Sequence, residues 1–464
     1  MRCKLVLIIL LTALMAALVL LQVPGVNGPW YWTWPYRVGE HRLPAWPLYA
    51  SMLLAAVPFA LAQSAYARGR VKLAVMLLAV TTLSLELTAL AHLPPTGLRR
   101  VTAIVQSAVN TSYYTDAYIL DEQENIATWE FLYQYPDLVP LLHLHAKYKP
   151  PGLVLYYLVW VKIFGKGAVA ATVGWTGVAL LAALAPVACF RMLRFFGRDE
   201  QAAFCGSSFL AMCPSLLLFL PQFDQVYPAI ACVILLLWGM AARDERWLAA
   251  LGCGAVLALG LFMSYIFLVL GCFVVMYWLL LAADRGSDVF WRAAMMGMLA
   301  LAAVAALYGL LFTLTGFNPI ATFHSISRTQ AQDLLPLARP FPQHILFDLL
   351  DFALGSAWIS FLLVLFFLVG AGGSIFDRSP RNRLVLLALV QIATVAAAAL
   401  LPGETARLWL LLYPLLMAPI GFELASWPAK SRMIVYGCLW LLLVVICQNM
   451  TLIYMGPELD GPRW

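Results

Sequence analysis

The segment LVLIILLTALMAALVLL, residues 5 to 21, contains no charged residue. As a helix it would rise about 25 Å, close to the roughly 30 Å hydrocarbon layer of a membrane. Similar runs recur to the C-terminal end of the 464-residue chain, which is 63% hydrophobic and 11% charged, with a mean hydropathy of +0.86. Soluble domains are about 25% charged. The sequence therefore predicts an all-α polytopic membrane protein.

Run lengths and basic flanks predict about 13 transmembrane helices. The expected ranges are 5–22, 47–66, 72–92, 168–190, 203–220, 226–242, 247–263, 264–283, 290–315, 346–370, 384–401, 408–425 and 433–454. The division at Met263 and Ser264 rests on the least signal. With the N-terminus in the cytoplasm, short inner loops contain 17 of the 29 basic residues, as the positive-inside rule expects. The net charge of +6 thus reflects topology, and we expect no nucleic-acid partner.

One apolar run, Gly152 to Gly165, is too short to span and has Lys162 and Lys166 near its end. We expect an interfacial helix on the outer surface. The predicted organisation is then two N-terminal helices (1–71), a transmembrane module (72–315) with a large outer loop (93–167), a second outer loop (316–345) and C-terminal helices (346–464).

The first outer loop carries Asp116 and a basic element ending in Lys147, Lys149 and Pro150-Pro151. Transfer from an anionic lipid donor needs a carboxylate to take the acceptor proton and cations to neutralise the leaving phosphate. The two prolines hold an extended segment that presents the lysines at a defined place.

The order of these pieces resembles the GT-C superfamily of lipid-phosphate-sugar-dependent glycosyltransferases, especially glycosyltransferase family 39 and its protein O-mannosyltransferase and aminoarabinose transferase relatives. The matching pieces, within residues 72 to 425, are Tyr114-Thr-Asp116-Ala117, His145-Ala-Lys147-Tyr-Lys149-Pro150-Pro151-Gly152, Phe164-Gly165, Arg191-Met-Leu-Arg194-Phe-Phe-Gly197, Pro221-Gln-Phe-Asp224, and Gly403-Glu404-Thr-Ala-Arg407-Leu-Trp409 with Pro414. The chain departs from family 39 in having Ala117 after Asp116 where paired acids are frequent, and Lys-Pro-Pro in place of His-Pro-Pro.

The resemblance implies a GT-C-like membrane glycosyltransferase that moves a sugar from a polyprenyl-phosphate donor, as substrate, to a glycan, lipid or protein acceptor. A bacterial inner membrane is the expected location, with the active site facing outward. Asp116 is the expected base. The expected substrate-binding residues are His143, His145, Lys147, Lys149, Asp224, Glu404 and Arg407, and we expect no metal.

Each residue also has a structural interpretation. Asp116 is equally suited to cap a helix that starts at Ala117. His143 and His145 are a weak metal pair without a further paired ligand, and a surface loop is the favoured structural interpretation for them. Lys147 and Lys149 suit lipid headgroups without selectivity. Arg407 lies three residues after Glu404, which favours a local ion pair.

Two other functions stay open. A secondary transporter would use intramembrane acids such as Glu86 and Asp224 to carry protons or sodium, although the sequence has no evident internal repeat. A flippase or polymerase of polyprenyl-linked glycans would use the same carrier lipid.

Overall fold

The computed structural model describes residues 2–28, 33–37, 45–93, 96–122, 127–333, 340–399, 401 and 403–451. Within these ranges the protein is all-α, with an isolated antiparallel bridge between Tyr36 and Met450. The expected end of the last span, at residue 454, lies outside the described ranges.

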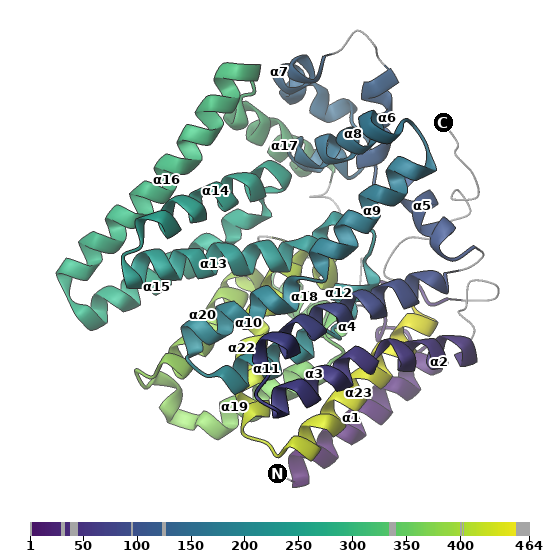
Figure 1. Ribbon diagram of the computed structural model, residues 1–464, viewed down its shortest axis with the longest axis vertical. Coiled ribbons are helices and arrows are strands. Elements are labelled where there is room, and N and C mark those ends of the chain that lie inside the picture. Colours follow the sequence, from purple (N-terminus) through teal and green to yellow (C-terminus); the bar gives the residue numbers. More distant parts are fainter. Residues whose placement is uncertain are drawn as a thin grey trace.

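The α-helices fall into four groups along the chain (Figure 1). The first group is α1 (Arg2–Leu20), α2 (Ala45–Ala55), α3 (Val57–Ala67) and α4 (Val71–Ala91). Four short helices follow, α5 (Leu98–Gln106), α6 (Tyr113–Glu122), α7 (Thr128–Leu138) and α8 (Gly152–Phe164). The third group is α9 (Ala168–Ala182), α10 (Ala185–Gly197), α11 (Glu200–Leu210), α12 (Pro214–Leu218), α13 (Tyr227–Asp244), α14 (Trp247–Met263), α15 (Gly271–Arg285) and α16 (Ser287–Thr315). The last group is α17 (Pro319–Asp333), α18 (Gln343–Gly355), α19 (Ile359–Ala371), α20 (Pro380–Ala397), α21 (Thr405–Leu408), α22 (Tyr413–Ala425) and α23 (Ala429–Asn449).

Short 3₁₀ helices join or extend several of these elements. They are η2 (Val139–Leu141), η3 (Ala146–Tyr148), η4 (Phe223–Val226), η5 (Tyr265–Leu270), η7 (Gly372–Phe376) and η8 (Trp409–Leu412).

Ten helices or helix pairs in the described part of the chain are long and apolar enough to cross a membrane. They are α1, α2 with α3, α4, α9 with α10, η4 with α13, η5 with α15, α16, α19 with η7, α21 with α22, and α23. The chain is therefore an integral membrane protein. The count of about 13 spans stays a prediction. Ten segments are long and apolar enough to cross a membrane, and α14, an expected span, is a shorter apolar helix.

Several of the expected spans are interrupted, among them residues 203–220 and 346–370. Residues 203–220 divide at Pro214 into α11 and α12, because proline cannot continue a helix from within. Residues 346–370 divide between α18 and α19, where Ala357 and Trp358 adopt φ values of 60° and 58°. The predicted division after Met263 is confirmed: α14 ends there and η5 begins at Tyr265.

Small residues allow the central helices to approach closely. An added Cβ at Gly206 of α11 would lie 2.7 Å from the carbonyl oxygen of Met417 in α22, and one at Gly421 would collide with Ala202 of α11. Membrane helices use small residues in this way because lipid supplies no hydrophobic driving force between them. Nearly all of α22 is buried, so it lies at the centre of the bundle.

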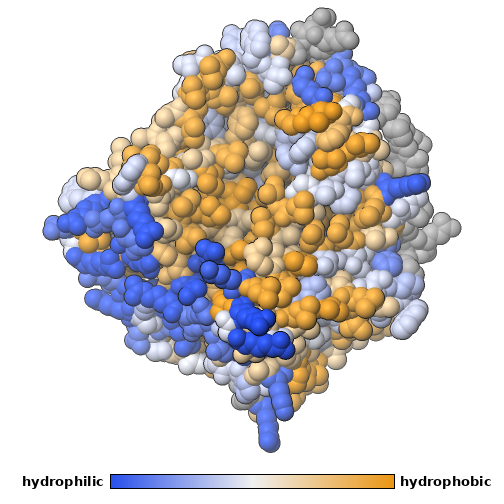
Figure 2. Space-filling model, in the orientation of Figure 1, coloured by the Kyte–Doolittle hydropathy of each residue, from blue (hydrophilic) through white to orange (hydrophobic). Residues whose placement is uncertain are grey.

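Helix α13 extends between two polar regions of the molecule. Its 18 residues rise about 27 Å, close to the hydrocarbon thickness. In Figure 2, hydrophobic residues cover the middle of this face, and hydrophilic residues gather at the lower left, over the end where α15 turns into α16. The short helices α5 to α8 lie at the other end, together with α17.

Both predicted outer loops contain helices. Residues 98–122 and 127–164 contain α5 to α8 with η2 and η3, and α17 takes up 15 residues of the range 316–345. At 13 residues, α8 rises only about 20 Å, too short to span. It packs against α6 and α9 and buries Leu153, Tyr157 and Val161. The side of the membrane on which these helices lie stays a prediction.

Candidate functional site

Asp116 and His143 form a hydrogen-bonded pair near the short helices. Asp116 lies in the first turn of α6 and is 7% exposed. One carboxylate oxygen is 2.6 Å from His143 Nδ1, and the other accepts the backbone N–H of His143 at 3.2 Å. The hydrogen bond that His143 makes to the Asp116 carboxylate raises the pKa of His143, and burial opposes this shift.

The helix that contains Asp116 begins earlier than the sequence indicates. It starts at Tyr113, so Asp116 lies inside its first turn and does not cap a helix starting at Ala117. An acid in a first turn is favoured by the helix dipole.

The segment from His143 to Lys149 is fixed against α6 and α7. Ser112, with φ of 56°, accepts the backbone N–H groups of His145 at 3.0 Å and Ala146 at 2.9 Å through its hydroxyl oxygen. The Tyr135 hydroxyl donates to the carbonyl oxygen of Lys149 at 2.7 Å. These contacts set the path of the basic element relative to Asp116.

Gly152 fixes the other end of this element. A Cβ there would collide with the carbonyl oxygen of Phe262 in α14. Only glycine allows α8 to start this close to α14, so the glycine after Pro150-Pro151 has a packing role.

Four charged side chains meet in what we call the buried ion cluster: Lys149, Asp224, Glu404 and Arg407. Lys149 Nζ donates to Asp224, whose second oxygen lies 3.6 Å from Arg407 Nε, and Arg407 also pairs with Glu404. The four side chains are 3% to 18% exposed. Sequence separation between Lys149 and Asp224 is 75 residues, so tertiary folding assembles the cluster.

Two tyrosines enclose the Lys149 ammonium group. The Tyr227 hydroxyl accepts from it at 3.0 Å, and the Tyr227 and Tyr113 ring centroids lie 5.0 and 5.9 Å away. Such cation–π contacts strengthen when they are desolvated. Burial lowers the pKa of Lys149, and the Asp224 carboxylate opposes that shift.

The charges of the cluster balance, with two cations against two carboxylates. Buried charges need this pairing, because an unpaired ion away from water is costly by several kcal/mol or more. The cluster can therefore receive an anion only if a carboxylate gives up part of its contact with Lys149 or Arg407.

His145 faces the cluster as a neutral group. Burial, together with the charges of Arg407 and Lys149, lowers its pKa to about 3. His145 therefore stays unprotonated at neutral pH.

Lys147 does not join the cluster. Its ammonium lies 2.6 Å from Asp333 at the end of α17, and the Tyr148 hydroxyl donates to the same carboxylate at 3.0 Å. The two lysines that sequence reasoning groups together thus have different partners.

Other acids considered from the sequence lie apart from the cluster's ion pairs. Asp121 lies 3.7 and 3.6 Å from Lys162 and Lys166, the basic end of α8. Glu86 is fully buried in α4, and its carboxyl oxygens have no hydrogen-bond partner among the described residues. No group of three or more His, Cys, Asp or Glu side chains suited to a metal occurs within the described ranges.

Sequence reasoning missed Tyr227 and the contact of Tyr113 with Lys149. A usable signal was the spacing of Asp224 and Tyr227, three residues apart at the start of a helix and therefore on one face. Two other tyrosines near Asp116 in the sequence have different partners: Tyr114 bonds the backbone of Gly167, and Tyr118 lies over Lys166.

The similarity found between this chain and known proteins is one of structure. No protein-family model matches the sequence. No curated protein matches it either. Among solved structures, it is similar to the crystal structure of ArnT from Cupriavidus metallidurans in the apo state, with a TM-score of 0.46 and 15% sequence identity. The match covers 71% of this chain and 58% of that one, so the chain aligns with less than two thirds of the ArnT structure.

Proposed function

We propose that this protein is an integral-membrane glycosyltransferase that transfers a sugar from a polyprenyl-phosphate donor to a glycan, lipid or protein acceptor on the extracytoplasmic face. The observation that carries the proposal is the convergence of Lys149, Asp224 and Arg407 at one end of α13. The Asp116–His143 pair lies at the start of the same loop segment. The motif order within residues 72 to 425 supports the same chemistry.

In this proposal Lys149 and Arg407 bind the donor phosphate. Arginine offers several donors to phosphate, and lysine offers a compact positive charge. As the bond between the sugar and the phosphate breaks, the leaving phosphate keeps the electron pair, and these cations stabilise its growing charge.

Asp224 and Glu404 keep the two cations positioned before the donor arrives. Asp224 contacts both Lys149 and Arg407, and Glu404 contacts Arg407. When the donor binds, its phosphate replaces part of these ion pairs. The cations are thus ready for an anionic ligand, yet none of them is buried without a partner before the donor arrives.

Asp116 acts as the base in the same reaction. It accepts the proton of the acceptor hydroxyl as the acceptor oxygen forms its bond to the sugar. His143 donates to Asp116 through its ring and its backbone N–H, and a carboxylate keeps further lone pairs for the acceptor. His143 is therefore a positioning residue.

The test is single-turnover transfer from a labelled polyprenyl-phosphate sugar in liposomes. Asp116→Asn keeps the shape of the side chain but removes its basicity, so the rate should fall by about 100-fold or more while donor binding changes little. Asp121→Asn, which alters an acid of the same helix paired with Lys162 and Lys166, is the matched control. A near-normal rate for Asp116→Asn would remove Asp116 from the mechanism, and no transfer from any polyprenyl donor would refute the function.

Glu86 favours one alternative, a secondary transporter. Its carboxyl group is fully buried in α4 without a hydrogen-bond partner among the described residues, and intramembrane acids often carry protons. Under the glycosyltransferase proposal Glu86→Gln leaves transfer unchanged. Mass spectrometry of the copurifying lipid discriminates further, because a bound polyprenyl phosphate is expected only of a protein that uses this carrier.

A further inference from the structure

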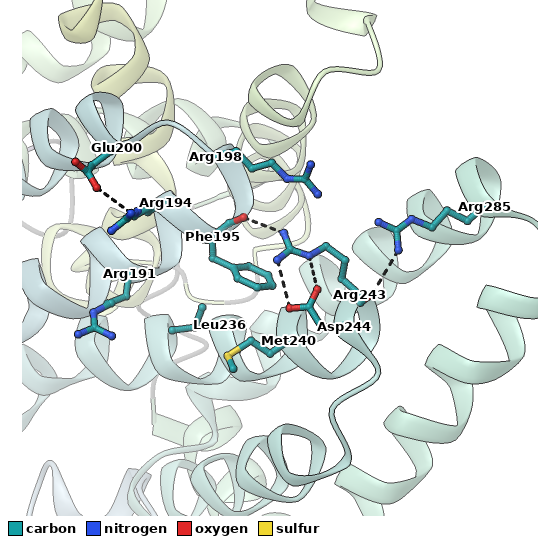
Figure 3. Close-up of a pocket in the computed structure, with 10 residues that line it drawn as sticks. All are labelled: Arg191, Arg194, Phe195, Arg198, Glu200, Leu236, Met240, Arg243, Asp244 and Arg285. Carbon is teal, nitrogen blue, oxygen red and sulfur yellow. Dashed lines mark hydrogen bonds and ion pairs between the residues drawn. The ribbon is translucent and has the colours of Figure 1, made fainter.

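A basic hollow opens at the opposite end of α13 from the buried ion cluster. It encloses about 740 Å³, and residues of α10, α11, α13 and α15 line it. Figure 3 shows these residues: Arg191, Arg194, Phe195, Arg198, Glu200, Leu236, Met240, Arg243, Asp244 and Arg285. Five arginines there face two carboxylates.

Helix α10 presents its arginines to the hollow as one stripe. Arg191, Arg194 and Phe195 follow the spacing i, i+3 and i+4, which places them on one face of α10. Arg198 follows directly after the last residue of the helix and also lines the hollow. The positive charge therefore extends along the helix and is not confined to the loop.

The two carboxylates in the hollow already have partners. Glu200 lies 2.9 Å from Arg194, and Asp244 lies 2.8 Å from Arg243. Arg243 also donates to the carbonyl oxygen of Phe195 at 3.0 Å, and its guanidinium stacks on the Phe195 ring at 3.6 Å.

The remaining arginines have no such neutralisation. Arg191 and Arg198 make no ion pair within the part of the chain that the structure describes, and both are exposed. Arg285 donates to the carbonyl oxygen of Arg243 at 3.4 Å. The hollow therefore carries an excess of positive charge that an anion would relieve.

An apolar wall continues from the arginines toward the middle of α13. Leu236 and Met240 lie on the same face of α13 as Asp244, at spacings of four residues. A ligand with a charged head and an apolar chain matches this order of side chains.

We propose that the basic hollow binds a phosphate group, with Arg191 and Arg198 as its principal unpaired donors. The ligand is the headgroup of an anionic phospholipid or a soluble phosphate anion. The Leu236 and Met240 wall favours the lipid, since basic pockets between membrane helices bind lipid phosphates. This site and the buried ion cluster lie toward opposite ends of α13, whose 18 residues rise about 27 Å.

The test measures lipid and phosphate binding to the purified full chain in neutral detergent. Native mass spectrometry titrates dioleoyl phosphatidylglycerol, with dioleoyl phosphatidylcholine as the uncharged comparison, and pyrophosphate is titrated as the soluble probe. The variant is Arg191→Gln combined with Arg198→Asn, because asparagine suits the φ of 55° at residue 198. Losing two arginines near a lipid phosphate should weaken phosphatidylglycerol binding about 30-fold.

The matched control is Arg68→Gln combined with Arg70→Gln. These arginines are also exposed, lie next to a helix end and do not line the hollow. If the hollow variant loses binding of phosphatidylglycerol, the ligand is a lipid. If it loses binding of pyrophosphate alone, the ligand is a soluble anion. If both probes bound the hollow variant as tightly as wild type, or if the control lost as much binding, a general surface charge would explain the arginines and the proposal would be overturned.

Discussion

The two ends of α13 both carry basic and acidic side chains, but these differ in burial and in charge balance. At its start, Asp224 lies between Lys149 and Arg407, and Glu404 completes a largely buried cluster that is balanced in charge. At its end, Arg243 and Asp244 belong to a hollow in which arginines outnumber carboxylates. A buried charge needs a partner of opposite sign, whereas an exposed arginine is hydrated and needs none. The difference teaches that burial, more than residue type, decides whether these charges neutralise one another.

The largest expected effect concerns the sides of the membrane on which the two ends lie. Cys3 is exposed, and the other eight cysteines are buried or partly buried, so the native chain already carries one accessible thiol. Lys4 beside it pairs with Glu423 at the end of α22, and Phe422 lies against Gly197 next to the hollow. The positive-inside rule predicts that this end is cytoplasmic.

A membrane-impermeant maleimide should therefore label Cys3 in right-side-out vesicles or spheroplasts only after permeabilisation. Leu144→Cys, at an exposed position beside His143, should be labelled without it when introduced with Cys3→Ser. Labelling of Cys3 in intact cells would invert the topology and place the hollow outside.

The second prediction removes an acid from each end of α13. Asp224→Ala should destabilise the protein by about 3 to 5 kcal/mol, because Lys149 then loses its carboxylate partner and Arg407 keeps only Glu404. Asp244→Ala removes a pair whose carboxylate is 33% exposed, and should change stability by about 1 kcal/mol or less. Unfolding by sodium dodecyl sulfate in mixed micelles measures both. Equal losses would show that burial does not separate the two ends.

The third prediction compares the neighbouring lysines. Lys149→Ala and Arg407→Ala should each lower transfer at limiting donor by roughly 10- to 150-fold, the loss of one charge-assisted bond to phosphate. Lys147→Ala breaks an exposed pair with Asp333 and should cause much less. Full turnover of the Lys149→Ala and Arg407→Ala proteins would remove the phosphate site from the buried ion cluster.

The smallest expected effect is a pH dependence of stability that separates His143 from His145. The folded-state pKa of His145 is lowered to about 3, while an unfolded histidine titrates near pH 6.5. The unfolded chain thus binds an extra proton below about pH 6.5, and this residue destabilises the fold as the pH falls toward 3. The raised pKa of His143 acts oppositely, adding stability that is present at low pH and lost as the pH rises through its folded value.

Melting temperatures at pH 7.5 and pH 5 measure these opposite contributions. His145→Gln should lose less stability than wild type on acidification, and His143→Gln should lose more. Variants that follow the wild-type curve in parallel would contradict both assignments.

Several elements could be predicted because their signals are local. The apolar run of α1 follows directly from composition and length, whereas the break after Met263, which the structure also contains, has the weakest signal in the sequence. Pro214 also breaks a helix where proline chemistry requires, yet sequence reasoning continued the span through it. The turn between α18 and α19 had no comparable local signal, because Ala357 and Trp358 adopt positive φ without glycine.

The candidate site divides in the same way. Asp224 and Arg407 could be selected because charged residues beside apolar runs are unusual, and Asp116 because a loop carboxylate near a basic element suits transfer from an anionic donor. Their partners could not, since Lys147 and Lys149 look alike in sequence and differ only in the element against which each packs.

Composition and charge pattern are enough to predict a helical membrane protein with an uneven distribution of basic residues, because hydrophobic length and charge act locally on each segment. The pairing of Lys149 with Asp224 across 75 residues, the pairing of Lys147 with Asp333, and the common hollow lined by arginines near α10, α13 and α15 arise from the tertiary fold. They could not be predicted locally because the energy of an ion pair depends on distance and on the water around it. Both are set by long-range packing.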